Sequence, residues 1–208
     1  MKMLKLNSKN IDTLFNRNLY FRRKSTVDKV ASIIEDVRIN GDAAVLKYTR
    51  RFDKVKLMPK DLTVAESEIS GAFQNITPEF VATLKLVINN VSTFYRKQVK
   101  KPCCVKSEDG ILLKEEYKPI DTVGVYIPAG TAPLVSSVYM TVIPAQIAGV
   151  KRIVIVTPPG KNGQVNPYIL AVANLLNVKE IYKIGGAQAI AAMAFGTRTV
   201  PKVDKIVG

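Results

Sequence analysis

Hydrophobic residues are spaced as in helices in the N-terminal part of the chain, and as in strands alternating with helices in the C-terminal part. In the N-terminal part, apolar positions repeat every three to four residues over 26–40, 42–52 and 77–100, which predicts three helices. Gly41 ends the first of them, and Asp42 is the expected cap of the second. The N-terminal region is therefore predicted to be helical.

The next stretch, 102–121, has two short extended runs on either side of Asp109–Gly110. An Asp-Gly pair between two extended runs is a typical hairpin turn. We therefore predict a hairpin that links two parts of the chain.

From residue 122 onward, short runs rich in valine and isoleucine alternate with helical segments. The expected strands are 122–128, 152–159, 180–185 and 204–208, and the helical segments between them are 136–149, 166–177 and 187–196. This alternation favours a parallel sheet. The predicted fold class is α/β, with an N-terminal helical region followed by an incomplete Rossmann-like parallel sheet with flanking helices.

The last predicted strand is followed by no further element, because the sequence stops at Gly208. A parallel sheet that stops in this way has an unpaired edge, so we expect the chain to be part of a longer protein. We divide it into 1–121, the helical region and linker hairpin of a first domain, and 122–208, a second domain that is incomplete at its C-terminal end.

The composition excludes several kinds of chemistry. The sequence has no histidine and only two cysteines, the neighbours Cys103 and Cys104. Catalysis by histidine, Ser–His–Asp triads and histidine-containing zinc sites are therefore excluded within this chain. Adjacent cysteines rarely bridge each other, so no disulfide framework is expected. We assign no catalytic residue and no metal ligand.

The formal net charge is +14, so the chain is strongly basic. The basic residues are scattered among acidic ones along the predicted helices, and aromatic residues do not interleave with them. A solvated basic face is therefore expected, and specific nucleic-acid binding is not. No segment has the pattern of a signal peptide or a membrane span, and we expect a cytoplasmic protein.

Three segments follow predicted strands, where open parallel sheets bind their ligands. Residues 126–133 form a loop rich in proline and glycine, and residues 157–164 either reach a ligand or only turn at the surface. The third segment is 183–197, KIGGAQAIAAMAFGT. Its Gly185 and Gly186 precede a helix whose free N–H groups can meet an anion.

These segments contain no standard nucleotide-binding motif, neither G-x-G-x-x-G nor G-x-x-x-x-G-K-[ST]. Gly130 allows close approach of the backbone to a ligand, and Tyr126 offers a flat face with a hydroxyl group. From the residues alone, a dinucleotide site and a sheet domain with ordinary turns both stay open.

Longer strings of the sequence are more specific. The stretches VGVYIPAGTAPLVSSVYMTVIPAQIAGVKRIVIVTPP and KIGGAQAIAAMAFGTRTVPKVDKIVG resemble histidinol dehydrogenase, and INGDAAVLKYTRRFDKV is similar to the N-terminal helices of that family. The resemblance covers essentially the whole chain and about the first half of the family's usual length.

The resemblance implies an NAD- and zinc-dependent oxidoreductase of histidine biosynthesis. Such an enzyme oxidises L-histidinol to L-histidine through an aldehyde and forms a homodimer. It also implies that Tyr126 flanks NAD and that Gln188 hydrogen-bonds it. Gly130, Gly185 and Gly186 are expected to let the backbone approach NAD closely. The alternatives are a Tyr126 that fills a gap at a strand end and a Gln188 that faces solvent.

The family's zinc ligands and its acid–base groups include histidines, so the resemblance places them outside this chain, together with the stretch that binds the substrate's amino alcohol. We therefore expect the isolated 208-residue chain to lack dehydrogenase activity. The competing hypothesis is a non-catalytic, basic remnant that binds a nucleotide or another polyanion.

Overall fold

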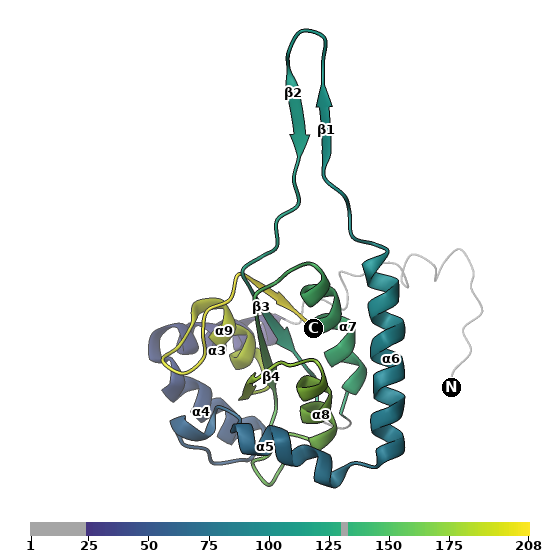
Figure 1. Ribbon diagram of the computed structural model, residues 1–208. Coiled ribbons are helices and arrows are strands. Elements are labelled where there is room, and N and C mark those ends of the chain that lie inside the picture. The colour runs from purple at the N-terminus through teal and green to yellow at the C-terminus, as the bar shows by residue number, and fades with distance from the viewer. Residues whose placement is uncertain (1–23, 130–132) are drawn as a thin grey trace, which may run out of the picture.

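A parallel sheet with helices on both faces forms the body of the molecule, and a hairpin projects from it (Figure 1). The computed structural model describes residues 24–129 and 133–208. The predicted α/β fold class is confirmed. Helices from the N-terminal half and from the C-terminal half both pack on this sheet.

The body is organised around one four-stranded sheet in the order β5-β4-β3-β6. All of its neighbouring strands are parallel. The strands are β3 (Thr122–Tyr126), β4 (Arg152–Thr157), β5 (Glu180–Lys183) and β6 (Lys205–Val207). All four predicted strands are present, although each is shorter at its carboxyl end than the sequence predicts.

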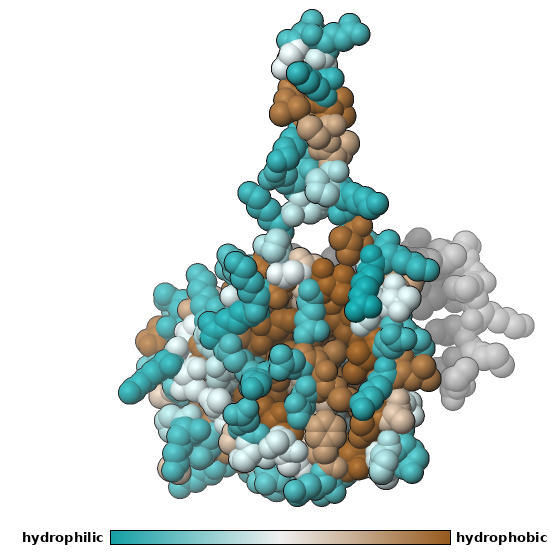
Figure 2. All heavy atoms as spheres, viewed as in Figure 1, coloured by the Kyte–Doolittle hydropathy of each residue, from teal (hydrophilic) through white to brown (hydrophobic). Residues whose placement is uncertain are grey.

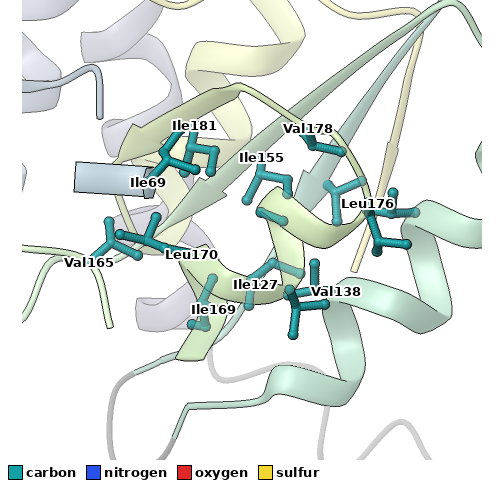
Figure 3. Packing of buried hydrophobic residues seen from close by; sticks show 14 of the residues in the cluster. Ile69, Ile127, Val138, Ile155, Val165, Ile169, Leu170, Leu176, Val178 and Ile181 are labelled. Carbon is teal, nitrogen blue, oxygen red and sulfur yellow. The ribbon is translucent and has the colours of Figure 1, made fainter. Parts of the chain in front are cut away.

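One face of the sheet is covered by helices from both halves of the chain. They are α5 (Glu66–Gly71), α6 (Pro78–Arg96), α7 (Val135–Ile147) and α8 (Pro167–Leu175), with the 3-10 turn η2 (Ala72–Asn75). Their apolar side chains meet those of the strands, such as Ile155 and Ile181, in a core whose central members are fully buried (Figure 3). This burial is the main source of the body's stability.

The opposite face is covered by α3 (Lys24–Asn40), α4 (Asp42–Phe52) and α9 (Gly186–Phe195), with the 3-10 turn η1 (Pro59–Asp61) beside α4. The predicted capping role of Asp42 is wrong, because Gly41 is the N-cap of α4 and no side chain caps this helix. The Asp42 carboxylate instead accepts hydrogen bonds from Thr199, with 2.6 Å between Asp42 Oδ2 and Thr199 Oγ1. It therefore ties the loop after α9 to the N-terminal helices.

The two edges of the sheet differ. Residues 62–64 lie against β5, where Val64 N donates to Ile181 O at 2.9 Å and Lys183 N donates to Leu62 O at 2.7 Å. Across this edge, the Lys183 ammonium pairs with the Glu68 carboxylate of α5 at 2.7 Å. On the outer side of β6, no strand of the described residues is paired, so the unpaired edge expected from the sequence is found there.

The hairpin consists of β1 (Cys103–Lys106) and β2 (Leu112–Glu115), which pair antiparallel. The predicted turn at Asp109–Gly110 is confirmed, with Gly110 N donating to Ser107 O at 3.1 Å. Every residue of both strands is exposed, and both cysteines are free. We call residues 103–115 the arm, because this hairpin extends away from the body (Figure 1).

Helix α6 runs from the bottom of the body to the foot of the arm (Figure 1). Of its predicted apolar stripe only Leu84 is fully buried, while Phe94 is 61% exposed. The stripe therefore covers the core incompletely. Within the described residues, no helix is both long and apolar enough to cross a membrane.

Candidate nucleotide site at the strand ends

The strand order places a topological switch point at β3. The chain runs from β3 through β4 to β5 in one direction, and then returns to the other side of β3 as β6. Helices α7 and α8 therefore lie on one face of the sheet and α9 on the other. Open α/β sheets bind ligands in the crevice at the carboxyl ends of the strands beside such a point. Tyr126 is the last residue of β3.

Tyr126 reaches from the end of β3 to the beginning of α9. Its hydroxyl oxygen accepts a hydrogen bond from Gly186 N at 3.1 Å. Gly186 is the first residue of α9. The phenol oxygen therefore accepts a hydrogen bond from one of the N–H groups that have no partner within this helix. The ring itself is half-buried on the α9 side of the sheet. Two residues predicted for the site, 60 positions apart, are thus in direct contact.

Gly185 and Gly186 are both required at this turn, but for different physical reasons. Gly186 has φ +64°, which side-chain-bearing residues rarely adopt, and a Cβ there would lie 2.7 Å from Gln188 Oε1. Gly185 has an extended backbone, but a Cβ there would lie 2.6 Å from the Pro158 Cβ. Any larger residue at Gly185 therefore collides with the loop after β4. The close packing of this turn is what requires the Gly-Gly pair.

Gln188 lies in the first turn of α9 and is only 1% exposed. Among the described residues, neither its amide nitrogen Nε2 nor its amide oxygen Oε1 has a hydrogen-bond partner. A buried primary amide with no partner costs about 1–3 kcal/mol relative to a satisfied one. Native proteins keep such groups where a ligand or a water satisfies them. Gln188 therefore does not face solvent, and the described residues leave the hydrogen-bonding capacity of its amide unused.

The structure adds two residues that the sequence did not single out. Thr157 ends β4 and is fully buried, and its hydroxyl has no partner among the described residues. Pro158 packs against Gly185. Within 157–164, Gly160 N donates to Gln164 O at 2.8 Å, so this loop closes on itself. Thr157 could have been noticed in the sequence as a polar residue at the end of an apolar strand.

Helix α9 is held close to the sheet by a small residue on the strand beneath it. A Cβ at Gly124 in β3 would lie 2.5 Å from the Met193 sulfur, so the absence of a side chain lets α9 approach. Three alanines of this helix, Ala189, Ala191 and Ala192, are buried together with Met193. The second half of 183–197 is therefore a packing surface, while its first half forms the turn at the candidate site.

The structure brings four of the five predicted site residues together: Tyr126, Gly185, Gly186 and Gln188. The fifth, Gly130, lies outside the described residues. The cluster offers an aromatic face, the N-terminus of a helix and an unpartnered amide. This combination suits a ligand with both a flat ring and polar or anionic groups.

Comparisons with known proteins agree with the resemblance noted in the sequence. The sequence model of histidinol dehydrogenase matches residues 18–208. The chain belongs to the histidinol dehydrogenase family. It is 46% identical over 182 residues to the histidinol dehydrogenase of Clostridium acetobutylicum and 48% identical over 180 residues to that of Listeria innocua.

A solved structure of histidinol dehydrogenase from Elizabethkingia anophelis superposes with a TM-score of 0.83 at 41% identity. The match covers 87% of this chain and 41% of that one. The two curated relatives are covered to the same extent, at 42% of their length. The chain thus spans about two fifths of the length of the family members that it matches.

The family's two expected cofactors fit this chain differently. A nicotinamide dinucleotide fits the cluster, since its rings, phosphates and amides suit the aromatic face, helix N-terminus and free amide described above. Zinc does not fit the part of the chain that the structure describes, because no three His, Cys, Asp or Glu side chains are grouped there. We derive no step that involves zinc.

Proposed function

We propose that this chain provides the NAD-binding part of an enzyme that oxidises L-histidinol to L-histidine through an aldehyde, with NAD and zinc as cofactors. Membership of the histidinol dehydrogenase family supports the reaction. The observation that carries the assignment to this part of the chain is the buried Gln188 amide, which has no partner among the described residues and adjoins a helix N-terminus at the end of a parallel sheet.

In this proposal each residue of the cluster has a separate role. Gln188 uses its Oε1 and Nε2 atoms to accept and donate hydrogen bonds to NAD. Tyr126 packs its ring along the cofactor, and its hydroxyl holds Gly186 N in place. Gly185 and Gly186, together with Gly130, let the backbone approach the dinucleotide. NAD, when bound, supplies the acceptor for the hydride that leaves the alcohol carbon.

The remaining parts of the proposal come from the family. Residues 122–208 belong to the NAD-binding domain, and residues 1–121 belong to a first domain. The protein acts in the cytoplasm as a homodimer, with L-histidinol as substrate. We assign no catalytic residue and no zinc ligand to this chain, so the isolated chain has no dehydrogenase activity.

The test is a calorimetric titration of NAD into the 208-residue chain and its Gln188→Ala variant. Loss of the amide is expected to weaken NAD binding roughly tenfold, because two ligand hydrogen bonds of modest net strength are removed. Gln98→Ala is the matched control, since Gln98 is exposed and lines the groove at the foot of the arm, outside the Gln188 cluster. Equal NAD affinity in the Gln188→Ala variant and the wild type refutes the assigned role of Gln188.

The net charge of +14 favours one competing function, binding of polyanions without chemistry. The same titration, repeated at two salt concentrations, distinguishes NAD binding from polyanion binding. Binding of a polyanion through scattered lysines falls steeply with salt, whereas NAD held by an amide and an aromatic ring loses little affinity. A steep salt dependence that is unchanged by Gln188→Ala supports the competing function.

A further inference from the structure

Buried polar side chains gather at the carboxyl ends of the strands. Among the described residues, four polar side chains are buried: Thr49, Thr157, Lys183 and Gln188. Thr157 and Lys183 are the last residues of β4 and β5, and Gln188 lies in the first turn of α9. Lys183 alone of the four is charged, and it is only 7% exposed. Hydrophilic side chains are spread over the outer surface of the body, as the teal spheres of Figure 2 show for one face. Lysine is rarely buried, and then only where another group compensates its charge.

The charge of Lys183 is compensated by Glu68 on α5. Lys183 Nζ lies 2.7 Å from Glu68 Oε1, and the two side chains are 8% and 25% exposed. The same Glu68 oxygen accepts a hydrogen bond from Ala65 N at 3.3 Å, which fixes the carboxylate on the first turn of α5. The ion pair joins positions 115 apart in the sequence. It therefore connects a helix of the N-terminal part of the chain to the last residue of β5.

The end of β5 is held from both sides. On the outer side, Lys183 N donates to Leu62 O at 2.7 Å. On the inner side, Lys183 lies opposite Thr157 in the last pair of the register between β4 and β5. Directly after this clamp, Gly185 packs against Pro158 at the beginning of the turn that leads into α9. The position of Lys183 therefore sets the position of this turn.

An ion pair that is largely buried adds little to overall stability. Removing both charges from water costs about as much as their attraction returns, so replacement by apolar side chains of similar size is often neutral or stabilising. The best-attested role of such pairs is to select one arrangement of the elements that they join. Apolar contacts are less directional, and cores keep their stability with altered packing before they keep a single geometry.

We propose that Lys183 and Glu68 are positioning residues of the candidate site. Their ion pair fixes the end of β5 and thereby the turn that carries Gly186 and Gln188. They act through these two residues and not by contact with a ligand. Their effect on NAD affinity rests on the function proposed above, whereas their effect on the turn does not.

The amide of Gly186 reports on the turn without any ligand, because its N–H donates to the Tyr126 hydroxyl oxygen at 3.1 Å. Hydrogen exchange followed by NMR measures how often this bond opens. The test variant of the 208-residue chain is Lys183→Met with Glu68→Met, which replaces the ion pair by apolar side chains of similar length. We expect Gly186 N–H to exchange roughly tenfold faster, although the free energy of unfolding in urea does not fall.

Calorimetric titration of the same variant measures the effect on the ligand. We expect NAD to bind roughly fivefold more weakly, because Gln188 is less well preorganised. A merely structural ion pair changes stability and affinity together or changes neither. Weaker binding at undiminished stability is therefore the result that identifies a positioning role.

A second variant, Glu68→Gln, keeps the shape of the pair and removes one charge. Glu68 is partly exposed, so this change is milder and the chain is expected to fold. Gly186 N–H is expected to exchange roughly threefold faster in it.

The matched control is the ion pair at the opposite end of the same strands. Arg152 and Glu180 pair at 2.7 Å at the amino ends of β4 and β5, and their side chains are 46% and 38% exposed. Arg152→Met with Glu180→Met is expected to leave the exchange of Gly186 N–H and the affinity for NAD at their wild-type values.

The proposal is overturned if Gly186 N–H exchanges at the wild-type rate in both variants of the Lys183–Glu68 pair. It is also overturned if exchange accelerates equally at Ile155 in the core of β4, because the pair then contributes only to overall stability. Faster exchange at Gly186 with unchanged NAD affinity overturns the link to the ligand. Failure of the proposed function looks different: the wild type itself does not bind NAD, and the exchange rates still decide whether the ion pair positions the turn.

Discussion

The body and the arm both contain pairs of hydrophobic residues on neighbouring strands, but the pairs are buried in the body and exposed on the arm. In the body, Val125 of β3 lies opposite Ile155 of β4, and both side chains are fully buried. On the arm, Val105 of β1 lies opposite Leu113 of β2, and both are more than half exposed. Hydrophobic pairs on neighbouring strands thus stabilise this fold only where helices cover them, because the free energy comes from area removed from water.

The candidate site combines properties of both regions. Gln188 is as buried as the core residues of the body, yet its polar atoms lack partners among the described residues. The arm leaves apolar groups in water, and the site leaves polar groups out of water. The buried amide costs stability in the isolated chain, whereas the exposed apolar side chains of the arm contribute little to it.

The largest expected effect is in the body. Replacing the pair as Val125→Thr with Ile155→Ala removes buried methyl and methylene groups and leaves a cavity. The free energy of unfolding is expected to fall by more than about 3 kcal/mol, measured by urea denaturation. A loss below about 0.5 kcal/mol, the change expected for Val105→Thr with Leu113→Thr on the arm, means that the sheet core contributes no more than the arm, and the comparison fails.

A smaller effect of opposite sign is expected at the site. Gln188→Met replaces the unpartnered amide by an apolar group of similar length, so the free energy of unfolding is expected to rise by about 1 kcal/mol. The matched control is Gln146→Met, because Gln146 Nε2 donates to Leu176 O at 2.6 Å, so this variant is expected to be destabilised. The two melting temperatures should shift in opposite directions, and a shared direction contradicts the argument.

The smallest effect is expected on the arm. In the isolated chain, Val105→Thr with Leu113→Thr should change the free energy of unfolding by less than about 0.5 kcal/mol, because exposed side chains away from special features contribute little. A large loss of stability in urea denaturation of this variant indicates that the arm already packs on something in the isolated chain.

Much of the site could be predicted from the sequence. Gly185, Gly186 and Gln188 follow an apolar run that ends in a turn, and Tyr126 closes another. These positions are local features of strand ends. The contact between Tyr126 and Gly186 could not be predicted in this way, since it depends on the strand order. The burial of Gln188 and the unpartnered hydroxyl of Thr157 depend on how α9 and the neighbouring helices cover the sheet.

Asp42 illustrates the same limit. Its position after Gly41 is that of a helix cap, but its carboxylate binds Thr199, 157 positions away. The local sequence predicts only that Asp42 can cap a helix. Its actual partner, Thr199, depends on how α4 packs beside the loop after α9.

The sequence by itself determined the elements of this protein, because helix and strand periods, turns and breaks arise from neighbouring residues. Together with the resemblance to a family, it also identified which residues to consider at the site. Only the tertiary structure decided which apolar pairs are buried and which stay exposed, which edge of the sheet is covered, and that the Gln188 amide is left without a partner in the described part of the chain. Those properties depend on contacts between segments far apart in the chain, and burial is a property of such contacts rather than of any residue alone.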